Sequence, residues 1–413
     1  MGMLNIDELK EGMILDCDIT DNTKRYRIPR ETLLNTKHIR VFKMWGIKEV
    51  NIKGISEKKV ETEIKTDDNQ KLIQEASKII KIKFIHNNLK HEGVQELFKQ
   101  SIIYKAQQIK EGKLKPILPK ADSSSNIDIK KLKIDENELV KKVTELPTLP
   151  EIFYKLNSVI NDPRSSANDI EKVISKDSSL TLKVLKMANS SFYGLKTKID
   201  NISRAILSLG TTEIGMLAIG LTFVSYFKDI PNELVDMESF WRHSIACAIA
   251  SKTIASSKSV PGSERFFIGG LIHDIGRLVL FKFHPANVRE AMLYARQNNL
   301  FLYEVEDQLL NAKHSTIGRL LVKKWKLPVS IENMITFHHK PTNAQDPIDP
   351  AIINLADLIV NALDIGTSGE YLVPILEVET WKVLGVTPSI FETAINQINK
   401  QLQEIIKFFI HEK

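Results

Sequence analysis

Cysteine is scarce in this sequence, which has only Cys17 and Cys247 among its 413 residues. The two lie far apart and form no Cys-x-x-Cys motif, so the sequence indicates neither a disulfide framework nor a thiolate zinc site. Cys247 stands in the apolar stretch SIACAIASKTIA, which predicts a small core residue. A hydrophobic core must therefore hold the fold, and the 43% hydrophobic content can supply it.

Long hydrophobic runs are also missing. No apolar run reaches the roughly 18 residues that a membrane span needs. The start, MGMLNIDELKEGM, has neither the basic nor the apolar region of a signal peptide. We therefore expect a cytoplasmic protein that does not associate with a membrane, and its length allows about two or three domains.

The excess of positive charge is small and confined to one part of the chain. The formal net charge is +6, and the excess falls within residues 1–145 while the rest of the chain is balanced. Acids interleave with the bases, as in GISEKKVETEIKTDD, and aromatic residues do not alternate with them. This pattern is typical of a solvated surface and disfavours nucleic acid as a partner.

The hydrophobic periodicity predicts a mainly α protein in several parts. Residues 1–54 combine short alternating runs with one helical stretch, which indicates a small α+β module. Residues 55–112 have helical apolar spacing, and residues 113–138, with two prolines and a serine triplet, are typical of a linker. From residue 139 onward the helical period returns and strand signals are scarce, which predicts an all-helical C-terminal domain.

Six of the ten histidines lie between residues 243 and 339, each on or beside an apolar helical segment. One of them, His284, stands in FHP and is assigned to a helix end before proline. Two acids in similar apolar surroundings join the others. The candidate metal ligands are His243, His273, Asp274, His314, His338, His339 and Asp357.

Metal binding would explain several of these residues together. Imidazole and carboxylate donors from different helices suit iron, manganese, zinc or, less well, magnesium. Neighbouring helical residues point about 100° apart, so His273 and Asp274 reach one ion only at a corner between helices. Gly270 and Gly276 flank the pair and permit close helix approach, and a lone acid such as Asp357 is costly to bury without a partner. Taken singly, each of these histidines is more often a hydrogen-bonded core or surface residue than a ligand, and Asp357 alone could be satisfied by a buried arginine or by backbone donors.

The order H…HD…H…HH…D resembles the HD superfamily of metal-dependent phosphohydrolases. The wider wording, from LPTLPEIFYKLNSVINDPRSSANDIEKVISKDSSLTLKVLKMANSSFYG through GGLIHDIGRLVL to HHKP, resembles the HDOD family, the HD-related output domain of bacterial signalling proteins. The resemblance implies an HDOD helical domain over residues 139–342, followed by a C-terminal helical extension over 343–413. LKEGMILDCDIT…IRVFKMWGIKEVNIKG is similar to the small module that precedes HD-GYP cyclic-di-GMP phosphodiesterases.

The sequence differs from the HD-GYP enzymes at the positions where those enzymes bind their substrate. After the paired histidines it continues HHKPTNAQDPIDP, without the GYP signature, which disfavours cyclic-di-GMP hydrolysis. Ser239 stands where those enzymes carry a glutamate. Arg277 replaces the lysine expected after HDIG; it can clamp a phosphate but does not readily act as an acid.

Two functions remain open. The favoured one is a bacterial signal-transduction and regulatory protein whose HDOD output domain acts through signalling protein partners, without catalysis. The alternative is an active metal-dependent nucleotide phosphohydrolase or phosphodiesterase, with Asp274 and Arg277 as its catalytic residues. There, His243, His273, Asp274 and Asp357 bind a first divalent ion, and His314, His338 and His339 bind a second. A homodimer and a nucleotide ligand are compatible with either of these two functions.

Overall fold

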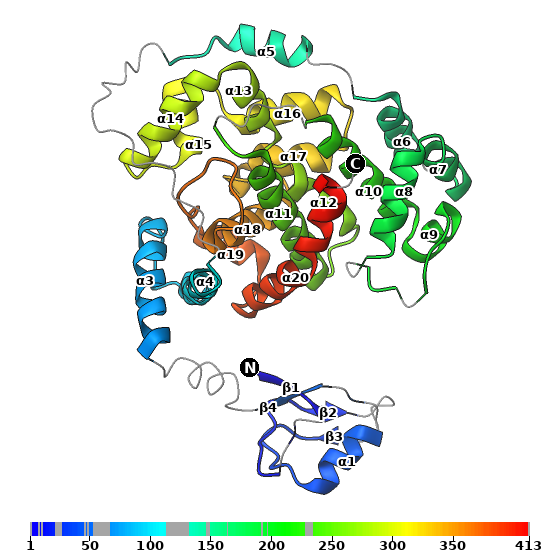
Figure 1. Cartoon of the computed structure of the whole chain (residues 1–413), viewed down its shortest axis with the longest axis vertical. Helices are drawn as coiled ribbons and strands as arrows, with labels where there is room; N and C mark the ends of the chain where they lie inside the picture. The colour runs from blue at the N-terminus through cyan, green and yellow to red at the C-terminus, as the bar shows by residue number, and fades with distance from the viewer. Residues whose placement is uncertain are drawn as a thin grey trace. The chain divides into compact units, whose positions relative to one another are not determined.

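The structure is a computed structural model of the chain. It describes residues 2–6, 9, 11–20, 27–44, 47, 49–52, 67–112, 132–145, 149–162, 164–190, 193–195, 197–227 and 234–411. Helices dominate these residues (Figure 1), so the mainly α fold class is confirmed. The chain divides into two compact units, Met1–Glu75 and Ala76–Lys413.

The first unit contains a small α+β module. Strand β1 (Gly2–Asn5) pairs antiparallel with β4 (Glu49–Ile52), and β2 (Ile19–Thr20) pairs antiparallel with β3 (Arg27–Ile28). One helix, α1 (Thr36–Met44), follows β3. Leu15, Leu34 and Phe42 form the centre of a separate hydrophobic cluster in this unit.

The second unit is helical. Helix α3 (Asp67–Lys83) begins in the first unit and ends in the second, and α4 (Glu92–Lys110) follows it. The next helices are α5 (Glu136–Glu145), α6 (Glu151–Asn161), α7 (Ala167–Ile174), α8 (Ser178–Ala188), α9 (Ile202–Leu209) and α10 (Thr211–Tyr226). The histidine-bearing part comprises α11 (Met237–Ser257), α12 (Glu264–Ile272), α13 (Ile275–Phe283), α14 (Pro285–Gln297), α15 (Leu302–Val305), the π-helical turn η3 (Glu306–Leu310), α16 (His314–Lys324) and α17 (Val329–Phe337). The last elements are η4 (Pro341–Asn343), α18 (Ile348–Leu363), α19 (Val378–Leu384), α20 (Ser389–Ile406) and η5 (Lys407–His411).

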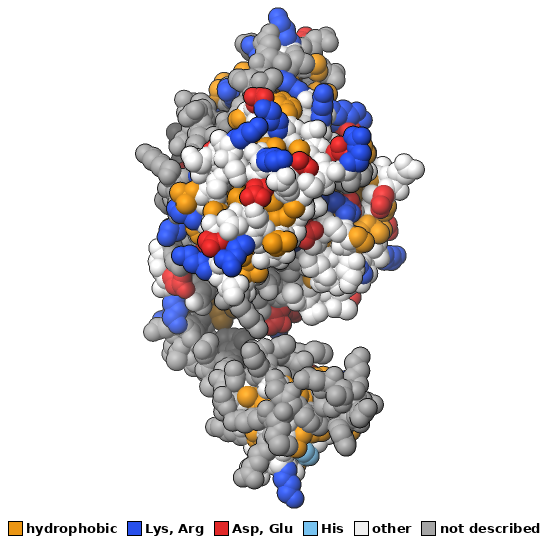
Figure 2. Space-filling view, turned by 90° about the vertical axis from the view of Figure 1, so that its right-hand side faces the viewer, with side chains coloured by type: hydrophobic (Ala, Val, Ile, Leu, Met, Phe, Trp, Pro, Cys, Tyr) orange, Lys and Arg blue, Asp and Glu red, His pale blue; other side chains and the backbone are white. Residues whose placement is uncertain are grey.

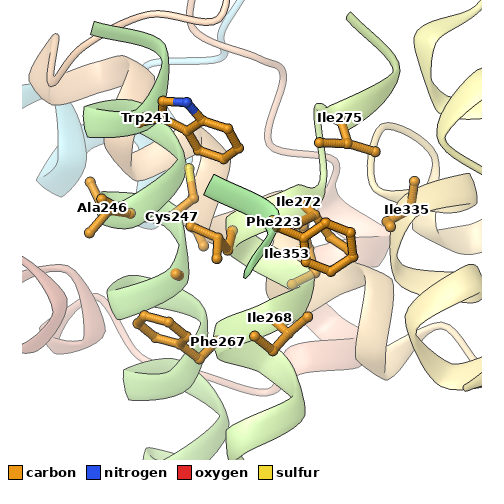
Figure 3. Packing of buried hydrophobic residues seen from close by; sticks show 14 of the residues in the cluster. Phe223, Trp241, Ala246, Cys247, Phe267, Ile268, Ile272, Ile275, Ile335 and Ile353 are labelled. Carbon is orange, nitrogen blue, oxygen red and sulfur yellow. The ribbon is translucent and has the colours of Figure 1, made fainter. Parts of the chain in front are cut away.

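Helix α11 lies at the centre of this unit. It packs against α12, α18 and α20, and most of its residues are buried. Figure 3 shows Cys247 on the side of α11 that faces α12, with Ala246 pointing away from it. A helix that is apolar on all sides is stable only when neighbours cover it, and these three helices provide that cover.

Aromatic side chains join helices α6–α10 to the histidine-bearing helices in one core. The ring of Phe223 on α10 lies 5.3 Å from that of Phe153 on α6 and 5.1 Å from that of Trp325, the residue after α16. All three side chains are fully buried. The two groups of helices therefore share a single hydrophobic cluster.

The predicted domain boundaries differ in detail from the packing. Residues 113–131 of the predicted linker lie outside the described residues, but its last part is packed: the Ile134 amide donates to the Leu310 carbonyl at 2.8 Å, and α5 begins at Glu136. Segment 343–413, which the resemblance predicted as a helical extension packing on the HDOD domain, supplies α18 and α20 to the packing around α11. The linker was separated in the sequence by its composition, which does not record long-range contacts.

Over the described ranges, no single helix has the length and hydropathy of a membrane span; α9 and α10 together pass that test only as a pair bent by 118°. The face of the helical unit visible in Figure 2 mixes Lys and Arg with Asp and Glu and with scattered hydrophobic side chains.

Candidate metal centre

The His273–Asp274 pair lies at a break between two helices. Helix α12 ends at Ile272 and α13 begins at Ile275, so both residues occupy the corner that the sequence predicted. The two flanking glycines allow this close packing. A Cβ atom on Gly276 would lie 2.0 Å from the His314 carbonyl oxygen, and one on Gly270 would lie 2.7 Å from the Cys247 carbonyl oxygen. The predicted close helix approach is therefore confirmed.

Four side chains form what we call the inner cluster: His243, Cys247, His273 and Asp357. All four are buried, and one ligand atom from each lies within 4.8 Å of the others. His243 and Cys247 come from α11 and Asp357 comes from α18. The Asp357 Oδ1 atom is 3.1 Å from His243 Nε2 and 3.5 Å from His273 Nε2. Two imidazoles thus face one carboxylate oxygen.

The outer cluster comprises Asp274, His314, His338 and His339, which also have ligand atoms within 4.8 Å of one another. His314 is the first residue of α16, and the paired histidines follow the end of α17. The His314 Nε2 atom lies 3.1 Å from Asp274 Oδ1, 3.2 Å from His338 Nε2 and 3.0 Å from His339 Nε2.

Asp274 connects the two clusters. Its Oδ2 atom lies 3.3 Å from His273 Nε2, whereas its Oδ1 atom faces His314 in the outer cluster. The structure therefore brings all seven predicted ligands together, around two neighbouring points rather than one. A carboxylate between two such points is placed to contact an ion at each of them.

The donor set fits divalent metal ions. His273 Nδ1 donates to the Gly270 carbonyl at 2.8 Å, and His338 Nδ1 donates to the Ile335 carbonyl at 2.7 Å. These bonds turn the Nε2 atom of each ring toward the cluster, which is the arrangement seen when histidine binds a metal. Among the described residues, His273 Nε2 and Asp274 Oδ1 are buried and make no well-formed hydrogen bond, although each has an oppositely charged neighbour, at 3.3 and 3.1 Å. Such groups are costly to bury, and an ion would satisfy both.

The buried charges set the protonation of the ligands. Burial opposes a charge on His273, but the carboxylates of Asp274 and Asp357 prevail and raise its pKa to about 10. Burial, together with the neighbouring His314 and His273, lowers the pKa of His338 to about 3. Burial likewise lowers the pKa of His339. At neutral pH the metal-free centre therefore holds a cationic His273 beside a neutral pair of ligands.

Arg277 does not face a substrate space, contrary to the phosphate clamp considered from the sequence. Its side chain is buried; Nη1 donates to Ser368 Oγ at 2.8 Å and Nε donates to Glu306 Oε1 at 3.1 Å. Nη1 also lies 3.4 Å from Asp274 Oδ2. The guanidinium is turned inward because three neighbouring carboxylates attract it, the third being Glu370 at 3.9 Å from Nη2.

A pocket of about 380 Å³ opens beside the outer cluster. Its lining includes His314, His339 and Glu306, together with Lys313 and Lys340, but no residue of the inner cluster. Small molecules can thus approach the outer cluster, whereas the inner cluster is enclosed.

Sequence reasoning missed several residues that support the centre. Glu306 is buried and pairs with His314 Nδ1 and with Arg277. Glu370 accepts backbone amides, including that of Leu302 at 2.9 Å, and burial raises its pKa to about 7. Glu306 lies in a π-helical turn and Glu370 in a loop, so neither falls in a helical pattern. π-Helical turns often mark functional sites, but this turn can be recognised only in the structure.

Comparisons with known proteins match this part of the chain. Residues 146–341 match the HDOD domain family. An uncharacterized protein of Treponema pallidum (strain Nichols) is 24% identical over 238 residues, which is 57% of this chain and 46% of that protein. The match therefore spans less than half of that relative's length.

Solved structures show the same helical fold. An HDOD domain protein of unknown function from Geobacter sulfurreducens is 21% identical, covers 67% of this chain and 100% of its own, and has a TM-score of 0.56. A candidate phosphohydrolase from Shewanella amazonensis SB2B is 25% identical, with coverages of 66% and 97% and a TM-score of 0.54. A candidate signal transduction protein from Marinobacter aquaeolei VT8 is 18% identical, with coverages of 74% and 72% and a TM-score of 0.54.

Proposed function

We propose, on the premise that residues 146–341 match the HDOD domain family, that the protein is a signal-transduction protein with a metal-loaded, non-catalytic centre. The seven ligands would hold divalent ions of the class that imidazole and carboxylate favour, namely zinc, iron or manganese ahead of magnesium. A bound ion supplies fixed positive charge and Lewis acidity in a buried place. The output of the domain is contact with protein partners, including a second copy of the chain.

The position of Arg277 carries the non-catalytic part of this proposal. A phosphohydrolase needs positive groups that meet the phosphate in the transition state. Here the guanidinium is buried and bonded to Glu306 and Ser368. The two lysines on the pocket wall are also paired, Lys313 with Asp307 at 2.8 Å and Lys340 with Glu377 at 2.7 Å. The cationic side chains of this wall thus already pair with protein carboxylates.

A buried chain of contacts offers a route for a signal into the centre. Lys83 at the end of α3 and Lys105 on α4 both pair with Asp364, the residue after α18, and the Lys105 distance is 2.6 Å. Lys83 also reaches the Asn361 carbonyl at 3.5 Å. The Asn361 side chain donates to Asp357 Oδ1 at 2.7 Å. A shift of α3 and α4 would therefore act on an inner-cluster ligand through two residues.

The first test of this function measures metal content and hydrolysis on one purified sample of the full chain. The substrates are common nucleotides and cyclic dinucleotides, in the presence of zinc or manganese. We expect stoichiometric metal and no hydrolysis above the rate of the metal-free protein. Metal-dependent hydrolysis by the wild type that is lost in Asp274→Ala, while circular dichroism shows that the variant is still folded, would overturn the non-catalytic proposal.

The second test separates the signal route from the metal site. Lys105→Met removes one buried partner of Asp364, and we expect metal affinity to fall by about fivefold, the lower end of coupling between sites. Lys78→Met makes the same change at an exposed position of α3 and serves as the control. Equal metal affinities in the two variants would remove the route from the account while leaving the metal site in place.

A second candidate function, metal-dependent phosphohydrolase on a nucleotide, is favoured by the pocket. Its 380 Å³ volume reaches His314 and His339 of the outer cluster, which an incoming phosphate could approach. In that case Glu306 and the two histidines would position the substrate, and the first test above would give hydrolysis. This candidate comes second because the two lysines of the pocket wall already pair with protein carboxylates.

A further inference from the structure

Cys247 lies one helical turn after His243 on α11, so both side chains are on the same face of the helix. The Cys247 side chain is fully buried. Its Sγ atom is 3.6 Å from His243 Nε2 and 4.0 Å from Asp357 Oδ1. The thiol therefore faces the inner cluster rather than a purely apolar neighbourhood, although Figure 3 shows apolar side chains packed nearby.

These separations resemble the edges of one tetrahedral coordination sphere. With bonds of about 2.1 Å to nitrogen or oxygen and about 2.3 Å to sulfur, tetrahedral ligand atoms lie about 3.4 to 3.6 Å apart. The measured separations are 3.6 Å for sulfur to His243 and 3.1 and 3.5 Å for Asp357 to the two histidines. Of these four separations, the sulfur to Asp357 distance, 4.0 Å, is the one above that range, and the two remaining separations, from His273 Nε2 to His243 and to the sulfur, lie within 4.8 Å.

A second observation also points to an ion at this position. His273 Nε2 is fully buried and makes no hydrogen bond within the described residues, although the Asp274 and Asp357 carboxylates lie 3.3 and 3.5 Å away, and it lies within 4.8 Å of the Cys247 sulfur. A core thiol needs no such neighbour, because a buried cysteine packs well against carbon. Two imidazole nitrogens, one carboxylate oxygen and one sulfur directed at a common point form a complete four-atom donor set.

We infer that Cys247 is the fourth ligand of the inner metal position, which then prefers zinc or ferrous iron over manganese and magnesium. This inference rests on the proposed metal-loaded function and adds to it the choice of metal, because soft thiolate ligands select such ions. As the sulfur–metal bond forms, the thiol proton is released to solvent. The outer cluster lacks sulfur, so its preference for zinc over manganese is the weaker one of imidazole and carboxylate donors.

Without an ion, burial raises the pKa of the Cys247 thiol, and the Asp357 and Asp274 carboxylates raise it further. The metal-free thiol is therefore protonated and inert. A divalent ion reverses the local charge and deprotonates a coordinating thiol. The same residue thus behaves as an ordinary core cysteine in the metal-free protein and as a ligand in the loaded one.

Cobalt(II) absorption of the full-length protein tests this ligand. A thiolate bound to cobalt gives a charge-transfer band in the near ultraviolet, which imidazole and carboxylate ligands do not give. We expect this band in the wild type and in Cys17→Ser, which removes the only other thiol. We expect it to vanish in Cys247→Ser, while the visible bands of bound cobalt remain because the other ligands are intact.

The outcomes separate this inference from the function it rests on. Bound cobalt without the near-ultraviolet band, or a band that survives in Cys247→Ser, overturns the thiolate ligand and leaves metal loading intact. A protein that takes up no cobalt overturns both. X-ray absorption of the zinc-loaded wild type needs no variant: we expect one sulfur at about 2.3 Å from zinc, and a shell of only nitrogen and oxygen contradicts the inference.

The choice of metal provides a third measurement. We expect Cys247→Ser to lower zinc affinity at the inner position by at least about tenfold, the smaller loss seen when even an outer-sphere partner is removed. Manganese affinity is expected to change little, so the ratio of zinc affinity to manganese affinity falls. Equal losses for zinc and manganese would show that the substitution disturbs packing instead, and thermal melting of the metal-free variant checks the fold.

Discussion

The inner and outer clusters lie side by side but differ in how they are built. The inner ligands are all buried, and three of them project from the interior of α11 and α18. The outer ligands stand at helix ends: His314 opens α16, and His338 and His339 follow α17. Closed metal sites are typical of structural roles, whereas sites with an open position are typical of chemistry.

Under the proposed function, this difference explains how a metal centre persists without catalysis. Ligands fixed in the middle of packed helices keep their geometry, since rigid elements hold a site more precisely than helix ends or loops. The inner cluster therefore joins α11 and α18 as part of the core. The outer cluster borders a pocket, and its environment can change without loss of the core.

The largest expected effect removes the residue that both clusters share. In Asp274→Ala we expect the outer position to lose more than about 100-fold in affinity, because a ligand is removed, and the inner position to lose about 10- to 100-fold, the loss for an outer-sphere partner such as this carboxylate beside His273. The metal-free protein also loses about 3 kcal/mol, because the buried Arg277 keeps only its other partners. Calorimetric metal titration and chemical denaturation measure the two effects.

The control for this variant is Asp349→Ala, which breaks the partly buried pair with Arg265 at 2.9 Å outside the centre. It costs about 1 kcal/mol and leaves metal affinity unchanged. If Asp274→Ala weakened only one metal position, Asp274 would belong to one cluster and the shared carboxylate would be refuted.

The two glycines allow each cluster to be disturbed separately. Gly270→Ala places a methyl group against the Cys247 backbone, whereas Gly276→Ala places one against the His314 carbonyl. Each overpacked variant loses roughly 1 to 3 kcal/mol of stability. We expect Gly270→Ala to weaken the inner position and Gly276→Ala to weaken the outer one, as measured by zinc and manganese titration.

Gly220→Ala is the matched control, because its new methyl group meets side chains rather than backbone: the ends of Leu271 and Ile268, at 3.1 and 3.2 Å, and the Phe409 ring at 3.6 Å. It is expected to change metal affinity at neither position. A common loss at both positions in Gly270→Ala and Gly276→Ala would mean that the clusters are not independent.

The two clusters also differ in the number of protons that an entering metal ion must displace. Since the carboxylates raise the pKa of His273 to about 10, an ion entering the inner cluster must displace its proton and also that of Cys247. In the outer cluster only His314 has a raised pKa, because burial lowers the pKa of His338 and His339. Each displaced proton makes affinity rise about tenfold per pH unit.

We therefore expect about two protons released at the inner position and about one at the outer. Titration calorimetry in buffers of different ionisation enthalpy counts them. In the metal-free protein the raised pKa of His273 has the opposite consequence: it stabilises the fold below about pH 6.5, and this contribution is lost as the pH rises toward 10. Equal proton counts at the two positions would contradict the contrast.

The smallest effect concerns the pocket side. The Tyr303 ring stacks on His339 with centroids 4.3 Å apart and an angle of 14°. Tyr303→Leu removes this contact and costs about 0.5 to 1.5 kcal/mol. We expect a few-fold loss of manganese affinity at the outer position and none at the inner position. An inner loss of the same size would show that the stacking supports the whole centre.

Seven of the eight residues in the two clusters could be selected from the sequence because each stands out from its surroundings. Asp357 within IINLADLIV and His273–Asp274 within GGLIHDIG are polar residues that an apolar helix does not need. Their order along the chain and the glycines beside them were sufficient to predict a shared centre at a helix corner. The small α+β module was predicted in the same way, from alternation followed by helical spacing.

Other features depend on contacts that no local pattern records. The direction of Arg277 follows from Glu306 and Glu370, which arrive from a π-helical turn and a loop. The place of Cys247 beside His243 follows from helical spacing alone, yet its nearness to Asp357 required the packing of α18 on α11. Local periodicity therefore predicted the elements, and the long-range contacts determined what the site residues meet.

Anomalous X-ray diffraction from crystals of the full chain grown with zinc and manganese tests the central claim most directly. We expect two metal positions on either side of the Asp274 carboxylate, with zinc at the inner one bonded to Cys247, His243, His273 and Asp357. Manganese is expected only at the outer position, beside the pocket. A single metal position shared by all ligands, or an inner ion without contact to sulfur, would contradict the account of two unlike metal positions.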